Sequence, residues 1–221
     1  MLSAHRVSPD DDEDFYPTPI WAARAGAERV AFLDSKARTA WEPACGAGHL
    51  AHGLRDYFPT VHTSDAYPYD GNQILDFTGL AAGRPNADWI ITNPPFNLAE
   101  DFIRLAWERA RRGVALLMKI AALETVGRHP LLTRDCPLTL VMPFSERVPM
   151  HKGRWEPDGS TAAFYAWFVW VKPALRPARF MARVGGELQP ATWLIPPGTR
   201  ARLERPDDAR LFGVGARGAA G

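Results

Sequence analysis

Short apolar segments alternate with helical patterns along most of this chain, and that alternation constrains the fold more than any other feature. The strand-like segments cover residues 39–44, 61–65, 88–92, 113–120, 138–144 and 161–171. Helical periodicity occupies most of the gaps between the earlier segments. Because parallel neighbouring strands need a crossover, which is usually a helix, the pattern predicts an α/β fold with a doubly wound, mainly parallel sheet.

The last two strand-like segments are connected differently. Residues 146–160 between them show no helical periodicity, so we expect the strands at 138–144 and 161–171 to form an antiparallel hairpin at the edge of the sheet.

Two helices have start signals in the sequence. Thr18 is a good N-cap and Pro19 a favoured first helical residue, and apolar residues follow at helical spacing at Ile20, Ala23, Ala27 and Val30. A capping box at residues 97–100 predicts a second helix that ends before Gly113.

Length and composition fit one soluble domain. The chain has 221 residues, of which 46% are hydrophobic and 23% charged, and its net charge is +1. It has no long apolar run and no secretory leader, which favours a cytoplasmic protein that does not span a membrane. Residues 1–13 are expected to be a mobile leader, 14–172 the main domain, and 173–221 an extension that is disordered from about Ala209.

Metal and disulfide sites are not indicated. Cys45 and Cys136 are far apart in sequence, and neither has a cysteine or histidine at metal-ligand spacing. Each is expected to be a small buried apolar side chain, and we predict no metal site.

A glycine loop follows the first predicted strand. Glu42 ends that strand, and Gly46 and Gly48 open a helix. Glycines here let a ligand lie against the main chain, although the full dinucleotide fingerprint lacks its third glycine. Asp65 ends the next strand, where an acidic residue is placed to bind both hydroxyls of a ribose. The alternative for Asp65 is a surface carboxylate at a turn.

An Asn-Pro-Pro-Phe loop follows the strand at 88–92. Two successive prolines stiffen the loop and leave the Pro94 carbonyl free to face a substrate. The Asn93 side-chain oxygen and that carbonyl can each accept a hydrogen from a weakly nucleophilic amine, and Phe96 can stack on a base. Without a ligand role, the segment would be a strand-terminating turn with a core phenylalanine.

With these motifs in this order, the chain resembles the class I S-adenosylmethionine-dependent methyltransferases. Residues 14–19, Asp-Phe-Tyr-Pro-Thr-Pro, are similar to the N-terminal motif of bacteriophage and prophage enzymes that methylate N6 of adenine in DNA. The resemblance spans residues 14 to about 172 and implies a catalytic domain there. It implies a seven-stranded Rossmann-like sheet in which a reversed last strand lies beside its predecessor.

The resemblance also implies the roles of individual residues. Asn93, Pro94, Pro95 and Phe96 would carry methyl transfer. S-adenosylmethionine would be bound by Phe15, Tyr16, Thr18, Pro19, Glu42, Ala44, Gly46, Gly48, Asp65, Ala66, Asp76, Phe77 and Asn93. Asp76 matches the carboxylate that binds the adenine of the cofactor, whereas Phe15 and Tyr16 are expected either to close over it or to be core residues.

The connection between the last two strands carries cations interleaved with aromatic side chains: Arg147, His151, Lys152, Arg154 and Trp155. Such a set suits a phosphate backbone and an unstacked base, although a solvent-exposed hairpin tip accounts for it equally well. The expected partner is a nucleic acid, and DNA is preferred over RNA. RNA adenine methylation, protein-glutamine methylation and a non-catalytic cofactor-binding module remain alternatives. The sequence does not indicate the recognition site or the oligomeric state.

Overall fold

The structure of the protein is a computed structural model, which describes residues 15–69, 71–79, 83–153, 156, 159 and 161–212. The predicted leader therefore lies outside the described residues. The strands are β1 (Thr39–Glu42), β2 (Thr60–Asp65), β3 (Gln73–Ile74), β4 (Trp89–Thr92), β5 (Gly113–Lys119), β6 (Leu140–Pro143), β7 (Tyr165–Val171), β8 (Arg183–Val184), β9 (Glu187–Leu188) and β10 (Ala191–Thr192).

The helices are α1 (Ile20–Leu33), α2 (His49–Leu54), α3 (Ala99–Arg109), α4 (Arg128–Pro130), α5 (Thr199–Leu203) and α6 (Pro206–Phe212). Short 3-10 segments are η2 (Phe96–Leu98), η3 (Ile120–Leu123), η5 (Pro173–Leu175) and η6 (Ala178–Phe180), and η4 (Leu131–Asp135) is a π-helix. None of the described helices is long and apolar enough to cross a membrane.

The main sheet has the strand order β10-β6-β7-β5-β4-β1-β2-β3. All neighbouring pairs are parallel except those of β7, which is antiparallel to both β5 and β6. The α/β, mainly parallel sheet with a reversed last strand is therefore confirmed. The sheet has eight strands rather than seven, because β10 pairs with β6. The predicted hairpin consequently does not form the sheet edge, and its two strands pair directly with each other.

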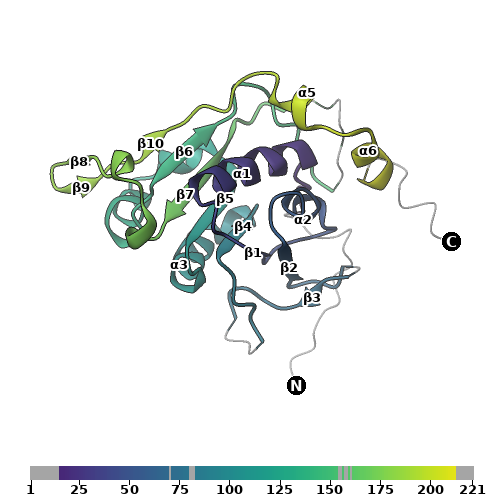
Figure 1. Cartoon of the computed structure of the whole chain (residues 1–221), viewed down its shortest axis with the longest axis horizontal. Helices are drawn as coiled ribbons and strands as arrows, with labels where there is room; N and C mark the ends of the chain where they lie inside the picture. Colours follow the sequence, from purple (N-terminus) through teal and green to yellow (C-terminus); the bar gives the residue numbers. More distant parts are fainter. Residues whose placement is uncertain are drawn as a thin grey trace.

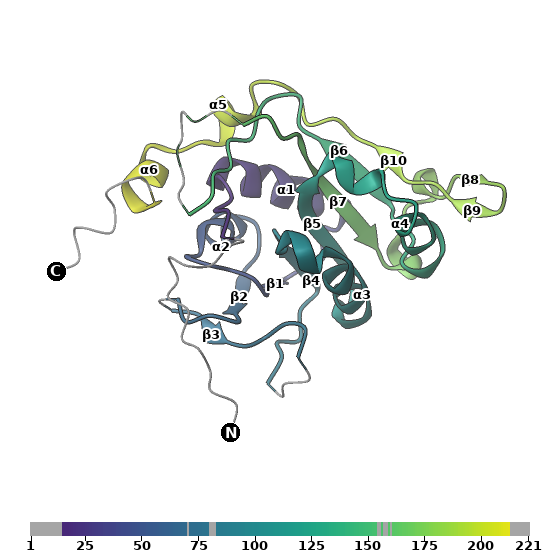
Figure 2. The same cartoon turned by 180° about the vertical axis from the view of Figure 1, so that it is seen from behind.

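Helices cover both faces of the sheet (Figures 1 and 2). On one face α1, α2 and α5 pack over a core that includes Trp21, Leu54 and Trp167. On the other face α3 packs over a second core with Phe102 and Phe168. The molecule thus has three layers, with the sheet in the middle.

Helix α1 approaches the sheet closely because of one glycine. A Cβ atom on Gly26 would lie 2.3 Å from the ring of Trp167 on β7. The Trp167 indole Nε1–H donates to the carbonyl of Ala22, at 3.0 Å. The helix begins at Ile20, and no side-chain capping bond is present, so the predicted N-cap role of Thr18 is wrong. Ile20, Ala23, Ala27 and Val30 are all buried, as their spacing predicts.

Two further sequence expectations need correction. Helix α3 starts at Ala99 after Leu98 and has no side-chain capping bond, so the predicted capping box does not form. Residues 209–212 belong to α6 instead of being disordered, whereas 213–221 lie outside the described residues. Both cysteines are free and buried, as expected.

Candidate functional site

The glycine loop between β1 and α2 is held in place by the end of β2. Gly46 and Gly48 both have positive φ, at +49° and +84°, which explains why the turn needs glycine. The Asp65 carboxylate accepts from the Gly46 N–H at 2.8 Å, and the Cys45 N–H donates to the carbonyl of Ser64 at 3.0 Å. The loop therefore lies directly against the carboxyl end of β2.

Asp65 has a structural function in addition to the one its position suggests. Its second oxygen accepts from the Tyr67 N–H, at 3.0 Å. These two bonds orient the carboxyl group. Asp65 is buried, and the alternative of a surface carboxylate is wrong.

Glu42 lies beside Asp65 at the end of β1. Its side chain is 2% exposed, and its Oε2 has no hydrogen-bond partner among the described residues. Burial, and after it the negative charge of Asp65, raise the pKa of Glu42 well above its usual value. An unpartnered buried acceptor is costly, so this oxygen is a candidate ligand for a donor group.

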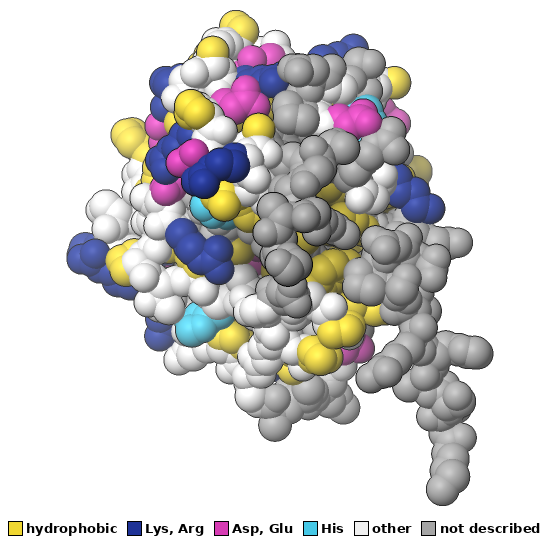
Figure 3. Space-filling view, turned by 90° about the vertical axis from the view of Figure 1, so that its right-hand side faces the viewer, with side chains coloured by type: hydrophobic (Ala, Val, Ile, Leu, Met, Phe, Trp, Pro, Cys, Tyr) yellow, Lys and Arg dark blue, Asp and Glu magenta, His cyan; other side chains and the backbone are white. Residues whose placement is uncertain are grey.

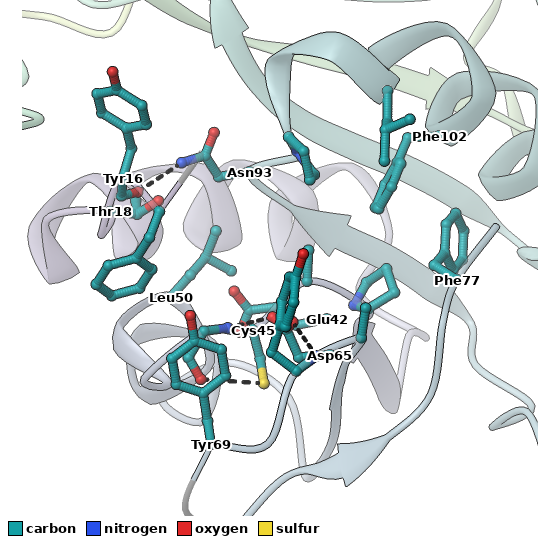
Figure 4. A pocket seen from close by; sticks show the side chains of 18 of the residues that line it. Tyr16, Thr18, Glu42, Cys45, Leu50, Asp65, Tyr69, Phe77, Asn93 and Phe102 are labelled. Atoms are coloured by element: carbon teal, nitrogen blue, oxygen red, sulfur yellow. Dashed lines mark hydrogen bonds between the residues drawn. The ribbon is translucent and has the colours of Figure 1, made fainter. Parts of the chain in front are cut away.

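Asn93 follows β4 and is fixed through its amide nitrogen. Nδ2 donates to the carbonyl of Tyr16 at 2.9 Å and lies 3.9 Å from the Met150 sulfur. Oδ1 is buried without a hydrogen-bond partner among the described residues. Figure 4 shows the nitrogen directed at Tyr16 and the oxygen directed away from the Glu42–Asp65 pair. The Asn93 amide is therefore held in one orientation through its nitrogen, while its oxygen has no hydrogen-bond partner among the described residues.

The rest of the Asn-Pro-Pro-Phe loop divides into buried and accessible parts. Pro94 is buried, whereas Pro95 and Phe96 are partly exposed. The Phe96 ring lies 5.0 Å from the ring of Tyr16, and the Lys119 Nζ lies 4.3 Å from its centroid. Phe96 is therefore a side chain at the edge of the site rather than a core residue.

One cavity of about 770 Å³ joins the glycine loop to the asparagine loop. It is lined by twelve of the predicted residues: Phe15, Tyr16, Thr18, Glu42, Ala44, Gly46, Asp65, Ala66, Asp76, Phe77, Asn93 and Pro95. Pro19, Gly48, Pro94 and Phe96 are not part of its lining. The structure thus brings together two loops that are about fifty residues apart in sequence.

Sequence reasoning missed eleven residues of the cavity wall: Pro17, Pro43, Cys45, His49, Leu50, Tyr67, Tyr69, Thr78, Asn97, Leu98 and Phe102. Most flank a predicted position, so proximity to a motif was the available signal. Tyr69 is less direct, because it reaches the wall from the segment after β2, and its ring lies 5.8 Å from the ring of Phe15.

Asp76 and Phe77 both line the cavity, and Phe77 lies on the side opposite Tyr16 (Figure 4). Asp76 accepts from the backbone N–H and the hydroxyl of Thr78, at 2.8 and 2.7 Å. Phe77 is buried between Trp41 and Phe102, with ring centroids 5.3 and 4.6 Å away. One carboxylate oxygen of Asp76 therefore already accepts two hydrogen bonds from Thr78. Phe77 is both a core residue and part of the cavity wall.

The predicted nucleic-acid-binding residues of the connection between β6 and β7 do not line the cavity where the structure describes them. None of Arg147, His151 and Lys152 lines the cavity, and Arg154 and Trp155 lie outside the described residues. His151 Nε2 is 3.9 Å from a carboxylate oxygen of Glu156. The connection reaches the site through the buried Met150 beside Asn93, and through the Gly153 N–H, which donates to the carbonyl of Phe15 at 2.8 Å.

Helix α6 contacts the cavity wall from outside. The Phe212 ring lies 4.6 Å from His49, which lines the cavity. The helix is anchored by Asp208, whose carboxylate is held by the Arg24 guanidinium at 2.5 and 2.8 Å, with both side chains only 1% exposed. The extension is thus packed against the domain at the glycine loop.

The surface around the site is mixed in character. Figure 3 faces the side toward which the parallel strands run, and hydrophobic side chains gather in its middle with Lys and Arg side chains on its border. No group of three or more His, Cys, Asp or Glu among the described residues is placed to hold a metal ion.

Comparisons with known proteins identify the fold. No family model and no curated protein matches the sequence. The methyltransferase subunit of a type I restriction-modification system from Streptococcus thermophilus superposes with a TM-score of 0.52 and 12% identity, over 82% of this chain and 47% of that chain. A modification subunit of a candidate type I restriction enzyme from Vibrio vulnificus superposes with a TM-score of 0.51 and 13% identity, over 90% of this chain and 52% of that chain.

A candidate RNA methyltransferase from Pyrococcus horikoshii also gives a TM-score of 0.51, with 13% identity over 68% of this chain and 84% of that chain. This chain therefore spans about half the length of the two type I subunits and most of the length of the third protein. At these identities the similarity shows the fold, which is the Rossmann-like fold of methyltransferases.

Proposed function

We propose that this protein transfers a methyl group from S-adenosylmethionine to the N6 amine of adenine in DNA. The observation that carries the proposal is the Asn93 amide, which has its nitrogen held by Tyr16 and its oxygen buried without a partner. A buried bare acceptor is costly unless a ligand uses it. Asn93 borders the same cavity as the glycine loop and three carboxyl groups, those of Glu42, Asp65 and Asp76.

The cavity fits the cofactor in size and in chemistry. A volume of about 770 Å³ lies in the usual range of about 300–1,000 Å³ for small-molecule sites. The bare Glu42 Oε2 would accept from the amino group, Asp65 would accept from the ribose hydroxyls, and Asp76 would accept from the adenine amine. Gly46 lines the cavity with a positive φ of +49°, a backbone conformation that glycine adopts without strain.

When bound, S-adenosylmethionine supplies a methyl group on a positively charged sulfur, which departs as a neutral thioether. The protein therefore needs to align and polarise the acceptor amine rather than supply a nucleophile. Asn93 Oδ1 and the Pro94 carbonyl would each accept one amine hydrogen and aim the nitrogen lone pair at the methyl. Asn93 is neutral and is no general base, so the extra proton passes to water after transfer.

The acceptor would enter from the side of Asn93 that faces away from the Glu42–Asp65 pair. Phe96 lies on the same Asn-Pro-Pro-Phe loop as Asn93, and its ring would stack on the base. In duplex DNA the adenine would have to be flipped out of the helix to reach the amide.

RNA is the second candidate acceptor, and it is favoured by the similarity in fold to a candidate RNA methyltransferase over 84% of that protein. A protein glutamine could in principle use the same amide acceptor, and a module that binds the cofactor without turnover would share the same fold. These alternatives differ in which polymer is labelled, so one assay separates them.

The test is to incubate the protein with methyl-labelled S-adenosylmethionine and DNA, RNA or protein, and then to map the modified group. Label on N6 of adenine in DNA supports the proposal. Label only on RNA or on glutamine contradicts it, and cofactor binding without transfer to any polymer indicates the non-catalytic module.

Two substitutions separate chemistry from cofactor binding. Loss of one preorganised polar contact in the transition state lowers a rate by about 100- to 1,000-fold, so we expect Asn93→Ala to do this while the cofactor Kd stays unchanged. Asp65→Ala should raise the cofactor Kd first, because it also releases the Gly46 loop. An unchanged rate for Asn93→Ala would mean that the proposed chemistry is wrong.

A further inference from the structure

Two cation–aromatic pairs lie outside the cavity at the carboxyl ends of the central strands. The Lys119 Nζ is 4.3 Å from the centroid of Phe96, and the Arg147 Cζ is 4.1 Å from the centroid of Phe164. Both distances are within the range of a cation–π contact. Lys119 and Phe164 were not predicted from the sequence.

The two pairs are neighbours because of the antiparallel β5–β7 register. Lys119, the last residue of β5, is opposite Tyr165, the first residue of β7, and the Ile120 N–H donates to the carbonyl of Phe164 at 2.9 Å. Phe96 follows β4, which pairs with β5 on its other side. Phe96, Lys119, Phe164 and Arg147 therefore form a row along one end of the sheet, which we call the rim.

The rim has unused binding capacity. Phe164 is 58% exposed, so its ring is accessible to a partner. Lys119 and Arg147 are exposed, and neither forms an ion pair with a carboxylate among the described residues. Arg147 uses only Nη1, in bonds to the carbonyls of Thr161 and Ala162, so Nε and Nη2 have no hydrogen-bond partner within the described part of the chain.

We propose that the rim binds the nucleic-acid strand on both sides of the target base. Lys119 and Arg147 bind backbone phosphates, and the exposed face of Phe164 stacks on a base next to the target. Positive groups that follow a backbone, combined with an aromatic platform, are the features of single-strand binding. This inference rests on the proposed function and adds the residues that hold the strand.

The charge of the rim favours a polyanion over a peptide. Lys119 and Arg147 are exposed cations that form no ion pair with a carboxylate among the described residues. Phosphates on either side of a nucleotide compensate both cations, whereas a neutral glutamine amide compensates neither. The rim therefore argues for a nucleic acid as the acceptor.

The binding test compares full-length Lys119→Gln, Arg147→Gln and Phe164→Leu with the wild type. Binding of a fluorescent single-stranded oligonucleotide is measured by anisotropy at several salt concentrations. Each lost phosphate contact should lower the slope of log K against log salt by about 0.7. Phe164→Leu should weaken binding at least about fivefold, because a stacked base contributes that much, without changing the slope.

A matched control lies at the opposite end of the sheet. Arg179 is also exposed, and its Cζ is 4.7 Å from the centroid of Phe180 in η6. Arg179→Gln and Phe180→Leu remove the same kinds of contact and should leave both slope and affinity unchanged. The cofactor Kd should be unchanged in all five variants.

The outcomes separate the rim from the proposed function. If the wild type methylates DNA and the rim variants match the wild type or the Arg179 control in slope and affinity, the rim proposal is overturned and the proposed function stands. If the wild type binds the cofactor but binds and methylates no nucleic acid, both are overturned. Lower slopes for the two cation variants, with an unchanged control, support the rim.

Discussion

Replacing Asp208 by Asn should strongly destabilise the protein. The Asp208 carboxylate accepts two hydrogen bonds from Arg24, and one of its oxygens also accepts from the Arg205 N–H at 2.9 Å. Breaking a buried pair costs about 3–5 kcal/mol, because it leaves a buried charge without compensation. Arg24 keeps Asp56 as a partner, at 2.7 Å, so we expect the lower limit, about 3 kcal/mol.

For a chain of this length each kcal/mol shifts Tm by about 2–4 °C, which gives a decrease of about 6–12 °C. Thermal unfolding followed by circular dichroism measures it. The control is Asp207→Asn on the same helix, because its side chain is 71% exposed and pairs with the exposed Arg210; an exposed pair contributes little. Equal Tm values for the two variants would refute the argument that α6 is anchored by a buried charge.

Two further predictions concern the cavity. Glu42→Gln should raise Tm at neutral pH and weaken cofactor binding. Below the usual Glu pKa of 4.5 the wild type and the variant should be equally stable. As the pH rises above that value the difference in Tm should widen, because the unfolded wild type loses the Glu42 proton while the folded wild type keeps it. A pH-independent gap between the two melting curves would contradict the raised pKa. Phe212→Ala removes the ring packed on His49 and should weaken cofactor binding in calorimetry, whereas Leu211→Ala, a nearly half-exposed neighbour, should not; equal affinities would count against a role for α6 at the site.

The two longest strands, β5 and β7, were predictable because each is an almost continuous apolar run. In β5 and β7 every residue except Lys119 is buried, and such runs are typical of strands covered on both faces. The reversal of β7 followed from the lack of a helix before it. The two-residue strands β3 and β10 were not predictable, because two residues carry no periodicity.

The motif residues of the site were predictable, and their partners were not. Asn93 could be assigned from its loop, but nothing in the sequence indicates that Met150, in a connection without periodicity, lies beside its amide. The same limit applies to Arg24, which occupies a helical position like any surface arginine. Its partner Asp208 is 184 residues away, and such a contact depends on the tertiary fold alone.

The insertion of β7 between β5 and β6 has a consequence for the order of assembly. Strand β6 emerges during synthesis before the strand that joins it to the rest of the sheet, so it has no neighbour in the sheet until residues 165–171 are made. Pairing between strands that are far apart in sequence is slow, because the entropy cost of closing the connecting loop comes before the stabilising contacts form. Helix α1 is completed later still. The Arg24 guanidinium gains its buried counter-ion, Asp208, only when α6 has left the ribosome, so we expect docking of α6 to be among the last events of folding.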